Sequence, residues 1–280
     1  MIPLYSMTGK EGYAATDNAL SAAFLLHNFG RREREMMENK YDEQEFFEKY
    51  AQMERSKKGL AGAGEWYAFQ RLLPDFTGKR VLDLGCGYGW HCGYAAQMGA
   101  AKVVGVDISS RMLQRAREMN SSPLISYHRA SIEEWEITES SFDIVISSLA
   151  LHYVEDYIGV CQRVWKGLTV EGNFVFSVEH PVFTAEGRQD WWYGKSGEKL
   201  HWPVDRYFSQ GRRDAVFLGE KMIKYHRTVG TYVNTLLNCG FELTELVEPE
   251  PEPQMLRENP AMKEELRRPM MLLISAQKRA

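Results

Sequence analysis

The chain has 280 residues, of which 44% are hydrophobic and 26% are charged, and its formal net charge is -4 at pH 7. This composition is ordinary for a globular protein of one large or two small domains, and the length is sufficient for a real hydrophobic core. The slightly acidic balance provides no excess of Lys and Arg for nucleic acid or an anionic membrane surface, and no apolar run approaches the ~20 residues of a membrane span, so we expect neither partner.

The N-terminal residues 1–35 include the apolar stretch A-A-F-L-L-H-N-F-G. No positively charged segment precedes it, which fits a secretory signal poorly, and we assign these residues no role beyond an N-terminal extension. Over residues 42–73 apolar side chains recur at spacings of three and four, which predicts helix. The run K-K-G-L-A-G-A-G at 57–64 divides this stretch into two helices.

From residue 79 onward, apolar strands alternate with helical stretches. The predicted strands are 81–84, 102–107, 125–128, 142–148 and 173–178, and the predicted helices between them are 90–98, 109–119 and 154–168. This alternation predicts a Rossmann-like, doubly wound α/β fold with a parallel sheet covered on both faces. A helix at 229–238 and strands at 241–247 and 270–276 complete the core, and V-E-P-E-P-E-P at 247–253 predicts an extended loop.

Residues 180–230 interrupt this rhythm and have no clear period. Their aromatic residues either stack on a planar or apolar acceptor or form the small core of an added subdomain, and four arginines are candidates for holding an anionic group. We therefore predict an inserted lid or acceptor region at 180–230 within a core formed by 36–179 and 231–280. The aromatic residues are Phe183, Trp191, Trp192, Tyr193, Trp202, Tyr207, Phe208, Phe217 and Tyr225, and the arginines are Arg206, Arg212, Arg213 and Arg227.

The four cysteines are scattered along the chain and form no C-x-x-C pair. We therefore expect neither a zinc site nor any other metal centre, no disulfide framework, and a reducing, cytoplasmic location. These residues are Cys86, Cys92, Cys161 and Cys239.

A glycine-rich turn follows the strand at 81–84 in the stretch R-V-L-D-L-G-C-G-Y-G-W-H-C. In an open parallel sheet, ligands bind beyond the carboxyl ends of the strands, and Gly85, Gly87 and Gly89 permit positive φ and a close approach of the backbone. The helix that begins near Trp90 directs free N–H groups at the same place. At the end of the next strand, Asp107 provides a carboxylate that can accept hydrogen bonds from both hydroxyls of a ribose, so an adenosine-containing ligand is favoured.

Two kinds of adenosine ligand fit these residues. A dinucleotide-binding turn has the spacing G-x-G-x-x-G. Such a turn would indicate a nicotinamide-dependent oxidoreductase. Here the spacing is G-x-G-x-G, preceded by Asp83, which disfavours that function. A non-catalytic module that merely binds the cofactor is a third possibility.

The turn with Asp83 resembles the first motif of the class I S-adenosylmethionine-dependent methyltransferases. Further segments resemble that family in the same order, over about residues 78–178: V-D-I-S-S-R-M-L-Q-R-A-R (106–117), A-S-I-E-E-W (130–135), S-F-D-I-V-I-S-S-L-A-L-H-Y (141–153) and L-T-V-E-G-N-F-V-F-S (168–177). The resemblance is strongest to the small-molecule branch, such as the enzymes of quinone biosynthesis. It implies a seven-stranded sheet with an antiparallel last strand, S-adenosylmethionine as cofactor and a small-molecule substrate.

The resemblance also implies roles for individual residues. The turn from Asp83 through Gly85, Cys86, Gly87 and Gly89 would pass under the methionine part of the cofactor, and Asp107 would hold its ribose. Around the adenine the resemblance places Ile108, Met112, Ser131, at a position where the family commonly has Asp, and Ile132. At the methionine end it places Leu149 and, as a partner of the carboxylate, Tyr50.

Two histidines are candidates for work on the acceptor. His152 follows the predicted fourth strand and His180 the fifth, so both belong at the edge where the cofactor is expected. Histidine titrates near neutral pH and can remove a proton from an acceptor or orient it. The alternative for each is an ordinary capping or hydrogen-bonded side chain at a strand end.

Overall fold

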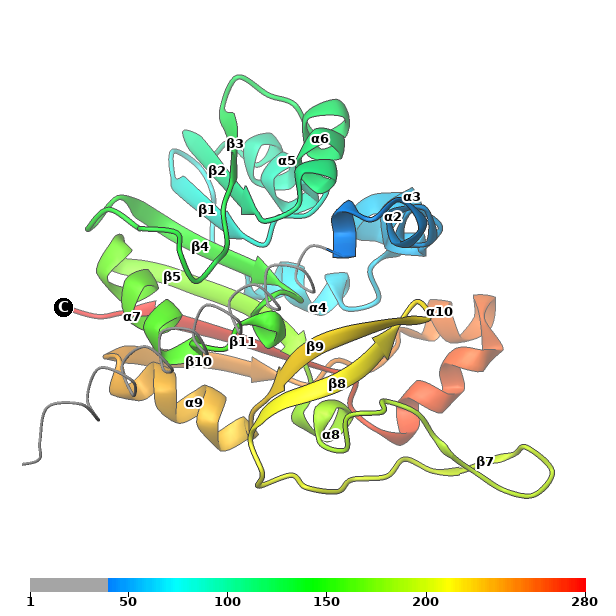
Figure 1. Cartoon of the computed structure of the whole chain (residues 1–280). Coiled ribbons are helices and arrows are strands. Elements are labelled where there is room, and N and C mark those ends of the chain that lie inside the picture. The colour runs from blue at the N-terminus through cyan, green and yellow to red at the C-terminus, as the bar shows by residue number, and fades with distance from the viewer. Residues whose placement is uncertain (1–39) are drawn as a thin grey trace, which may run out of the picture. The chain divides into compact units, whose positions relative to one another are not determined.

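The computed structural model describes residues 40–280 (Figure 1), so the predicted extension at 1–35 lies outside the described residues. Its main sheet has seven strands in the order β10-β11-β5-β4-β1-β2-β3. All neighbours are parallel except β11, which is antiparallel to both β5 and β10. The strands are β1 (Arg80–Leu84), β2 (Lys102–Asp107), β3 (Ile125–Arg129), β4 (Phe142–Ser148), β5 (Leu168–Glu179), β10 (Phe241–Val247) and β11 (Met271–Lys278). The predicted seven-stranded sheet with an antiparallel last strand is confirmed.

Helices cover both faces of this sheet. One buried cluster joins α7 and α9 to Leu82 and Leu84 of β1, and the other joins α4, α5 and α6 to Val81. This division follows from the alternation of side chains along a strand, which sends neighbouring residues to opposite faces. The core helices are α4 (Trp66–Leu72), α5 (Trp90–Gln97), α6 (Ser110–Met119), α7 (Tyr157–Gly167) and α9 (Val229–Asn238).

The helical stretch before the sheet is more broken than its pattern predicts. Besides the expected break near Gly59, a second break occurs at Met53, whose extended backbone (φ -64°, ψ 147°) ends one helix and starts the next. The segment consists of η1 (Lys40–Asp42), α2 (Gln44–Ala51), α3 (Glu54–Lys58) and η2 (Gly59–Gly62). We call residues 40–65 the N-terminal segment.

The predicted insertion contains a short helix and two antiparallel ribbons that lie outside the main sheet (Figure 1). Its aromatic side chains pack largely on one another, as in the stack of Phe183 on Trp202 at 4.8 Å, over which Arg268 lies. Arg213 and Arg227 are buried and donate to backbone carbonyls, so these two arginines have a structural role instead of an anion-binding one. The elements are α8 (Pro181–Thr184), β6 (Trp192–Tyr193), β7 (Lys199–His201), β8 (Gly211–Phe217) and β9 (Glu220–His226).

The β8–β9 ribbon reaches the N-terminal segment. The rings of Phe217 and Phe46 lie 6.0 Å apart, and Glu220 lies between Lys40 and Lys49, at 3.5 and 3.6 Å. Two stretches that are far apart in the sequence therefore meet beyond the carboxyl ends of the strands. The remaining elements are η3 (Leu151–Tyr153) after β4, and α10 (Pro253–Glu258) and η4 (Pro260–Arg267) before β11. Within residues 40–280, no helix has the length and apolar character to cross a bilayer.

Candidate functional site

The three glycines of the turn serve two different purposes. All have positive φ, 76° at Gly85, 52° at Gly87 and 73° at Gly89. A Cβ at Gly85 would overlap the Ala150 side chain and one at Gly89 would overlap the Tyr127 hydroxyl, whereas a Cβ at Gly87 would meet nothing within 4 Å. Gly85 and Gly89 are thus required by packing, and Gly87 alone leaves open space in front of the turn.

Asp107 connects this turn to the next strand. Its Oδ2 accepts a hydrogen bond from the Gly87 N–H at 2.8 Å, and its Oδ1 accepts one from the Ser109 N–H at 2.9 Å. Its backbone carbonyl accepts from the Ala130 N–H at 3.1 Å. Burial raises the pKa of Asp107 to about 6, and the nearby carboxylate of Asp42 adds to this rise. The carboxylate thus fixes the backbone on both sides of the open space.

Asp83 and Cys86 lie beneath the turn. Asp83 is 1% exposed; its Oδ2 accepts a weak bond from the Cys92 thiol at 3.3 Å, and its Oδ1 has no partner among the described residues. Burial raises the pKa of Asp83 to about 7 and that of Cys86 to about 11. The Cys86 thiol is therefore protonated at neutral pH and acts as a small packing group instead of a nucleophile.

The residues predicted for the adenine come from two adjoining loops. Ile108 follows Asp107, and its carbonyl accepts from Arg129 Nε at 3.1 Å; Met112 is buried in the first turns of α6. Ser131 accepts from the Glu133 N–H at 3.2 Å. The side chain of Ile132 approaches the position that a Cβ at Gly85 would occupy, at 3.3 Å. These loops lie beside Asp107 and the turn.

Leu149, at the exit of β4, has an unusual backbone. Its φ is 50°, which is uncommon for a residue other than glycine. Its N–H donates to the carbonyl of Ser177 at 2.9 Å and to Ser177 Oγ at 3.1 Å. Such strain costs on the order of 1–3 kcal/mol and is concentrated at functional sites. The conformation also brings Ala150 against Gly85.

The N-terminal segment packs on the turn. The Tyr50 ring lies 5.7 Å from the ring of Tyr88, a residue of the turn, and 5.4 Å from that of Tyr41. Arg55 is paired with Glu65, whose side chain is buried and whose second oxygen has no partner among residues 40–280. The Arg55 charge opposes the rise that burial causes in the pKa of Tyr50. Nothing in the helical pattern of the sequence distinguishes Arg55 from a solvated charge, so Arg55 was not among the predicted site residues.

The two candidate histidines lie at the ends of adjacent strands, as predicted, and have different partners. His152 is buried, its Nδ1 accepts from the Glu179 N–H at 3.4 Å, and burial lowers its pKa to about 4. His180 caps α8, because its Nδ1 accepts from the Val182 N–H at 3.0 Å, and its Nε2 lies 2.7 Å from a carboxylate oxygen of Glu248. His180 is therefore held through Nδ1, whereas its buried Nε2 lies close to Glu248 without a well-formed hydrogen bond among residues 40–280.

A buried charged network near His152 was not foreseen. The side chain of Lys224, on β9, is 2% exposed, and its Nζ lies 2.5 Å from Glu179 Oε1 and 2.8 Å from Gln189 Oε1. Gln189 Nε2 donates to the other oxygen of Glu179 at 2.6 Å. Burying such a pair costs several kcal/mol per ion before the pairing offsets it. The sequence contained no signal for this network, because Lys224 lies in a stretch without a clear period.

Comparison with known proteins places this geometry in a family. A family model described as a methyltransferase domain matches residues 81–172. The crystal structure of an S-adenosylmethionine-dependent methyltransferase from Mesorhizobium loti is 43% identical, covers 79% of this chain and all of that chain, and has a TM-score of 0.74. A provisionally assigned S-adenosylmethionine-dependent methyltransferase from Listeria monocytogenes is 54% identical over the same shares of both chains, with a TM-score of 0.76.

Two curated relatives match over shorter lengths. Malonyl-[acyl-carrier protein] O-methyltransferase of Enterobacter lignolyticus is 30% identical over 54% of this chain and 58% of that protein. Ubiquinone biosynthesis O-methyltransferase of Neisseria meningitidis is 34% identical over 37% of this chain and 45% of that protein. The chain thus spans about half the length of these two relatives.

Proposed function

The chain belongs to the S-adenosylmethionine-dependent methyltransferases, and from this premise we propose that it transfers the methyl group of that cofactor to an oxygen, nitrogen or carbon atom of a small molecule. The observation that carries the proposal is the open space in front of Gly87, next to the Asp107 carboxylate. Family membership leaves the nicotinamide-dependent oxidoreductase without support.

The residues around this space fit the cofactor. Gly87 permits the close approach, and Asp107 supplies the acceptor that ribose hydroxyls require. At the opposite end, the cationic Arg55, with Tyr50 beside it, suits the carboxylate of the methionine part. The loops with Ile108, Met112, Ser131 and Ile132 would enclose the adenine, with Asp83 and Cys86 supporting the turn from beneath, and Leu149 would approach the sulfur.

The methyl transfer itself requires little chemical activation by the protein. When bound, the cofactor supplies a methyl group on a positively charged sulfur, which already activates it. The side chains then have to hold the acceptor in line and exclude water. The contact between Phe217 and Phe46 supports such exclusion, because it joins the β8–β9 ribbon to the N-terminal segment beyond the strand ends.

The contact of the β8–β9 ribbon with the N-terminal segment and the names of the relatives both support a small acceptor group. We place the acceptor beside the β8–β9 ribbon, where His152 and the Lys224–Glu179 pair lie. The two curated relatives are named for malonyl-[acyl-carrier protein] and for ubiquinone biosynthesis, so the first of them acts on a small group that a protein carries.

Isothermal titration calorimetry with S-adenosylhomocysteine and with NADH tests the proposal. We expect saturable, micromolar binding of S-adenosylhomocysteine and no heat with NADH. Methylation of small carboxylates, phenols and amines by a labelled cofactor then identifies the acceptor class. Absence of binding by folded protein, or saturable binding of NADH instead, would contradict the proposal.

Cofactor binding should depend on pH through Asp107. Since burial raises the pKa of Asp107 to about 6, its carboxylate is ionised above that pH and becomes protonated below it. Ribose hydroxyls bind the ionised form better, so the affinity for S-adenosylhomocysteine should fall as the pH is lowered from 8 to 5, with a midpoint near 6. Asp107→Asn should flatten this profile, whereas Asp83→Asn should retain the step; a flat profile in the unmodified protein would disprove the assignment.

His152 and His180 remain the candidates for work on the acceptor, and we expect His152 to matter more. Since its Nδ1 accepts a backbone N–H, the neutral ring of His152 carries its proton on Nε2 and can donate it to an acceptor atom. His152→Asn should lower kcat about 3–10-fold at saturating cofactor, the loss of about one neutral hydrogen bond. His180→Ala should mainly lower thermal stability, because it removes the side-chain acceptor that caps α8. Equal kcat values for His152→Asn and the unmodified protein would exclude His152.

A further inference from the structure

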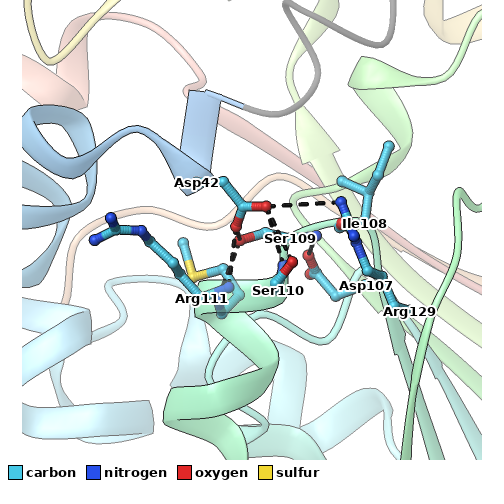
Figure 2. Close-up of polar contacts among 8 residues, drawn as sticks. Asp42, Asp107, Ile108, Ser109, Ser110, Arg111 and Arg129 are labelled. Atoms are coloured by element: carbon cyan, nitrogen blue, oxygen red, sulfur yellow. Dashed lines mark hydrogen bonds and ion pairs between the residues drawn. The ribbon is translucent and has the colours of Figure 1, made fainter.

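Asp42 joins the N-terminal segment to the start of α6 (Figure 2). Its Oδ1 accepts hydrogen bonds from Ser109 Oγ at 2.6 Å and from the Arg111 N–H at 3.0 Å. Its Oδ2 accepts from the Ser110 hydroxyl at 3.2 Å and the Ser110 N–H at 3.3 Å, and lies 3.8 Å from the Arg129 guanidinium. One carboxylate from the N-terminal segment thus binds the three successive residues Ser109, Ser110 and Arg111, which follow Asp107 and Ile108.

Helix capping alone does not account for this arrangement. The helix α6 already has its own N-cap, because Ser109 Oγ accepts from the Met112 N–H at 3.1 Å. Asp42 adds two further caps, on the N–H groups of Ser110 and Arg111, and also a tether on the Ser109 hydroxyl. The N–H of Ser109 in turn donates to Asp107. The chain of hydrogen bonds therefore runs from Asp42 through Ser109 to Asp107, and from Asp107 to the backbone of Gly87.

The same tether positions the N-terminal segment. Asp42 ends η1, immediately before α2, which carries Tyr50, and Arg55 follows in α3. Phe46 and Lys49 attach this segment to the β8–β9 ribbon, and Tyr50 packs on Tyr88 of the glycine turn. Asp42 supplies the hydrogen bonds that attach this segment to the residues following Asp107.

We propose that Asp42 is a positioning residue for the cofactor, which couples the docking of the N-terminal segment to the geometry of Asp107. The proposal rests on the proposed function, because it assumes that Asp107 and the N-terminal segment hold the two ends of one cofactor. Binding of the cofactor then stabilises the docked segment, and the docked segment strengthens binding by the same factor.

The charge of Asp42 shows that it would act by fixing the position of Asp107 and not by favouring the ionised form of Asp107. Asp42 and Asp107 are both acidic, and the charge of Asp42 contributes to the raised pKa of Asp107. Asp42 therefore opposes the ionisation of Asp107 while fixing its position. Tyr41, Tyr50, Asp83 and Cys86 also interact with Asp107, but the tyrosines and the thiol stay protonated near neutral pH because their pKa values are raised.

The test compares Asp42→Ala and Asp42→Asn with the unmodified protein. We expect S-adenosylhomocysteine to bind about 5–20-fold more weakly to Asp42→Ala, with kcat at saturating cofactor within about twofold. In Asp42→Asn, which keeps the shape without the charge, the pH midpoint of binding should move below its value in the unmodified protein. In hydrogen exchange, S-adenosylhomocysteine should protect residues 42–51 of the unmodified protein and fail to do so in Asp42→Ala.

Asp75→Asn is the matched control. Asp75 also accepts from a backbone N–H and a hydroxyl, both of Thr77, at 3.0 and 2.8 Å, but it has no contact with the site. If Asp42→Ala and Asp75→Asn bind S-adenosylhomocysteine as tightly as the unmodified protein, the inference is overturned while the proposed function stands. If the unmodified protein itself binds none, the proposed function fails and the coupling fails with it.

Discussion

Replacing Asp107 by Ala is expected to weaken the binding of S-adenosylhomocysteine by about 100-fold or more. Hydrogen bonds to a charged group contribute roughly 1.5–3 kcal/mol each, and two ribose hydroxyls can share this carboxylate, while each 1.4 kcal/mol corresponds to about tenfold in affinity. The substitution also removes the acceptor that fixes the N–H groups of Gly87 and Ser109. Isothermal titration calorimetry at pH 8, where Asp107 is ionised, measures the effect.

Asp143 supplies the control for this substitution. It accepts from the Arg80 N–H at 2.8 Å, as Asp107 does from Gly87, but it lies near the amino end of β4, whereas Asp107 lies at the carboxyl end of β2. The Arg80 guanidinium lowers the pKa of Asp143 to about 2. Asp143→Ala should reduce the free energy of unfolding and leave the affinity unchanged. A similar loss of affinity in both variants, or in neither, would contradict the role of Asp107.

The order of the core elements could be predicted from the sequence because it depends on local patterns. The strands β2, β4 and β10 and the helix α9 occur at the predicted residues, since runs of apolar residues bounded by polar turns determine them. The insertion was not predictable in detail, because its partners are distant in the sequence. Trp202, for example, packs against Phe183 on one side and Arg268 on the other.

The same distinction applies to the site. The glycine turn and Asp107 could be identified because their spacing along two successive strands fixes their relation. Asp42, Arg55 and Lys224 could not, because each looks like a solvated charge until the fold brings it to its partner. The contact of Asp42 with Ser109 spans 67 positions and that of Lys224 with Glu179 spans 45. Charges whose role depends on such distant contacts have no local signature.

Gly85→Ala and Gly87→Ala should separate the two functions of the turn. At Gly85 the new Cβ overlaps Ala150 and the φ of 76° is unfavourable, so we expect the protein to lose about 2–4 kcal/mol of unfolding free energy. At Gly87 the φ of 52° costs about 1–2 kcal/mol, and no described atom lies within 4 Å of the new Cβ. Denaturant unfolding measures both changes.

Binding should respond in the opposite order. The Cβ at Gly87 enters the space that we assign to the cofactor, so Gly87→Ala should weaken S-adenosylhomocysteine binding by at least about 30-fold although most of the protein's stability is retained. Gly85→Ala, once folded, should lose less affinity, because its Cβ lies between the turn and Ala150. A folded Gly87→Ala that binds normally would mean that the space in front of Gly87 holds no ligand. Gly85 and Gly89 would then have only a packing role and Gly87 only a conformational one, and the cofactor would have to lie elsewhere.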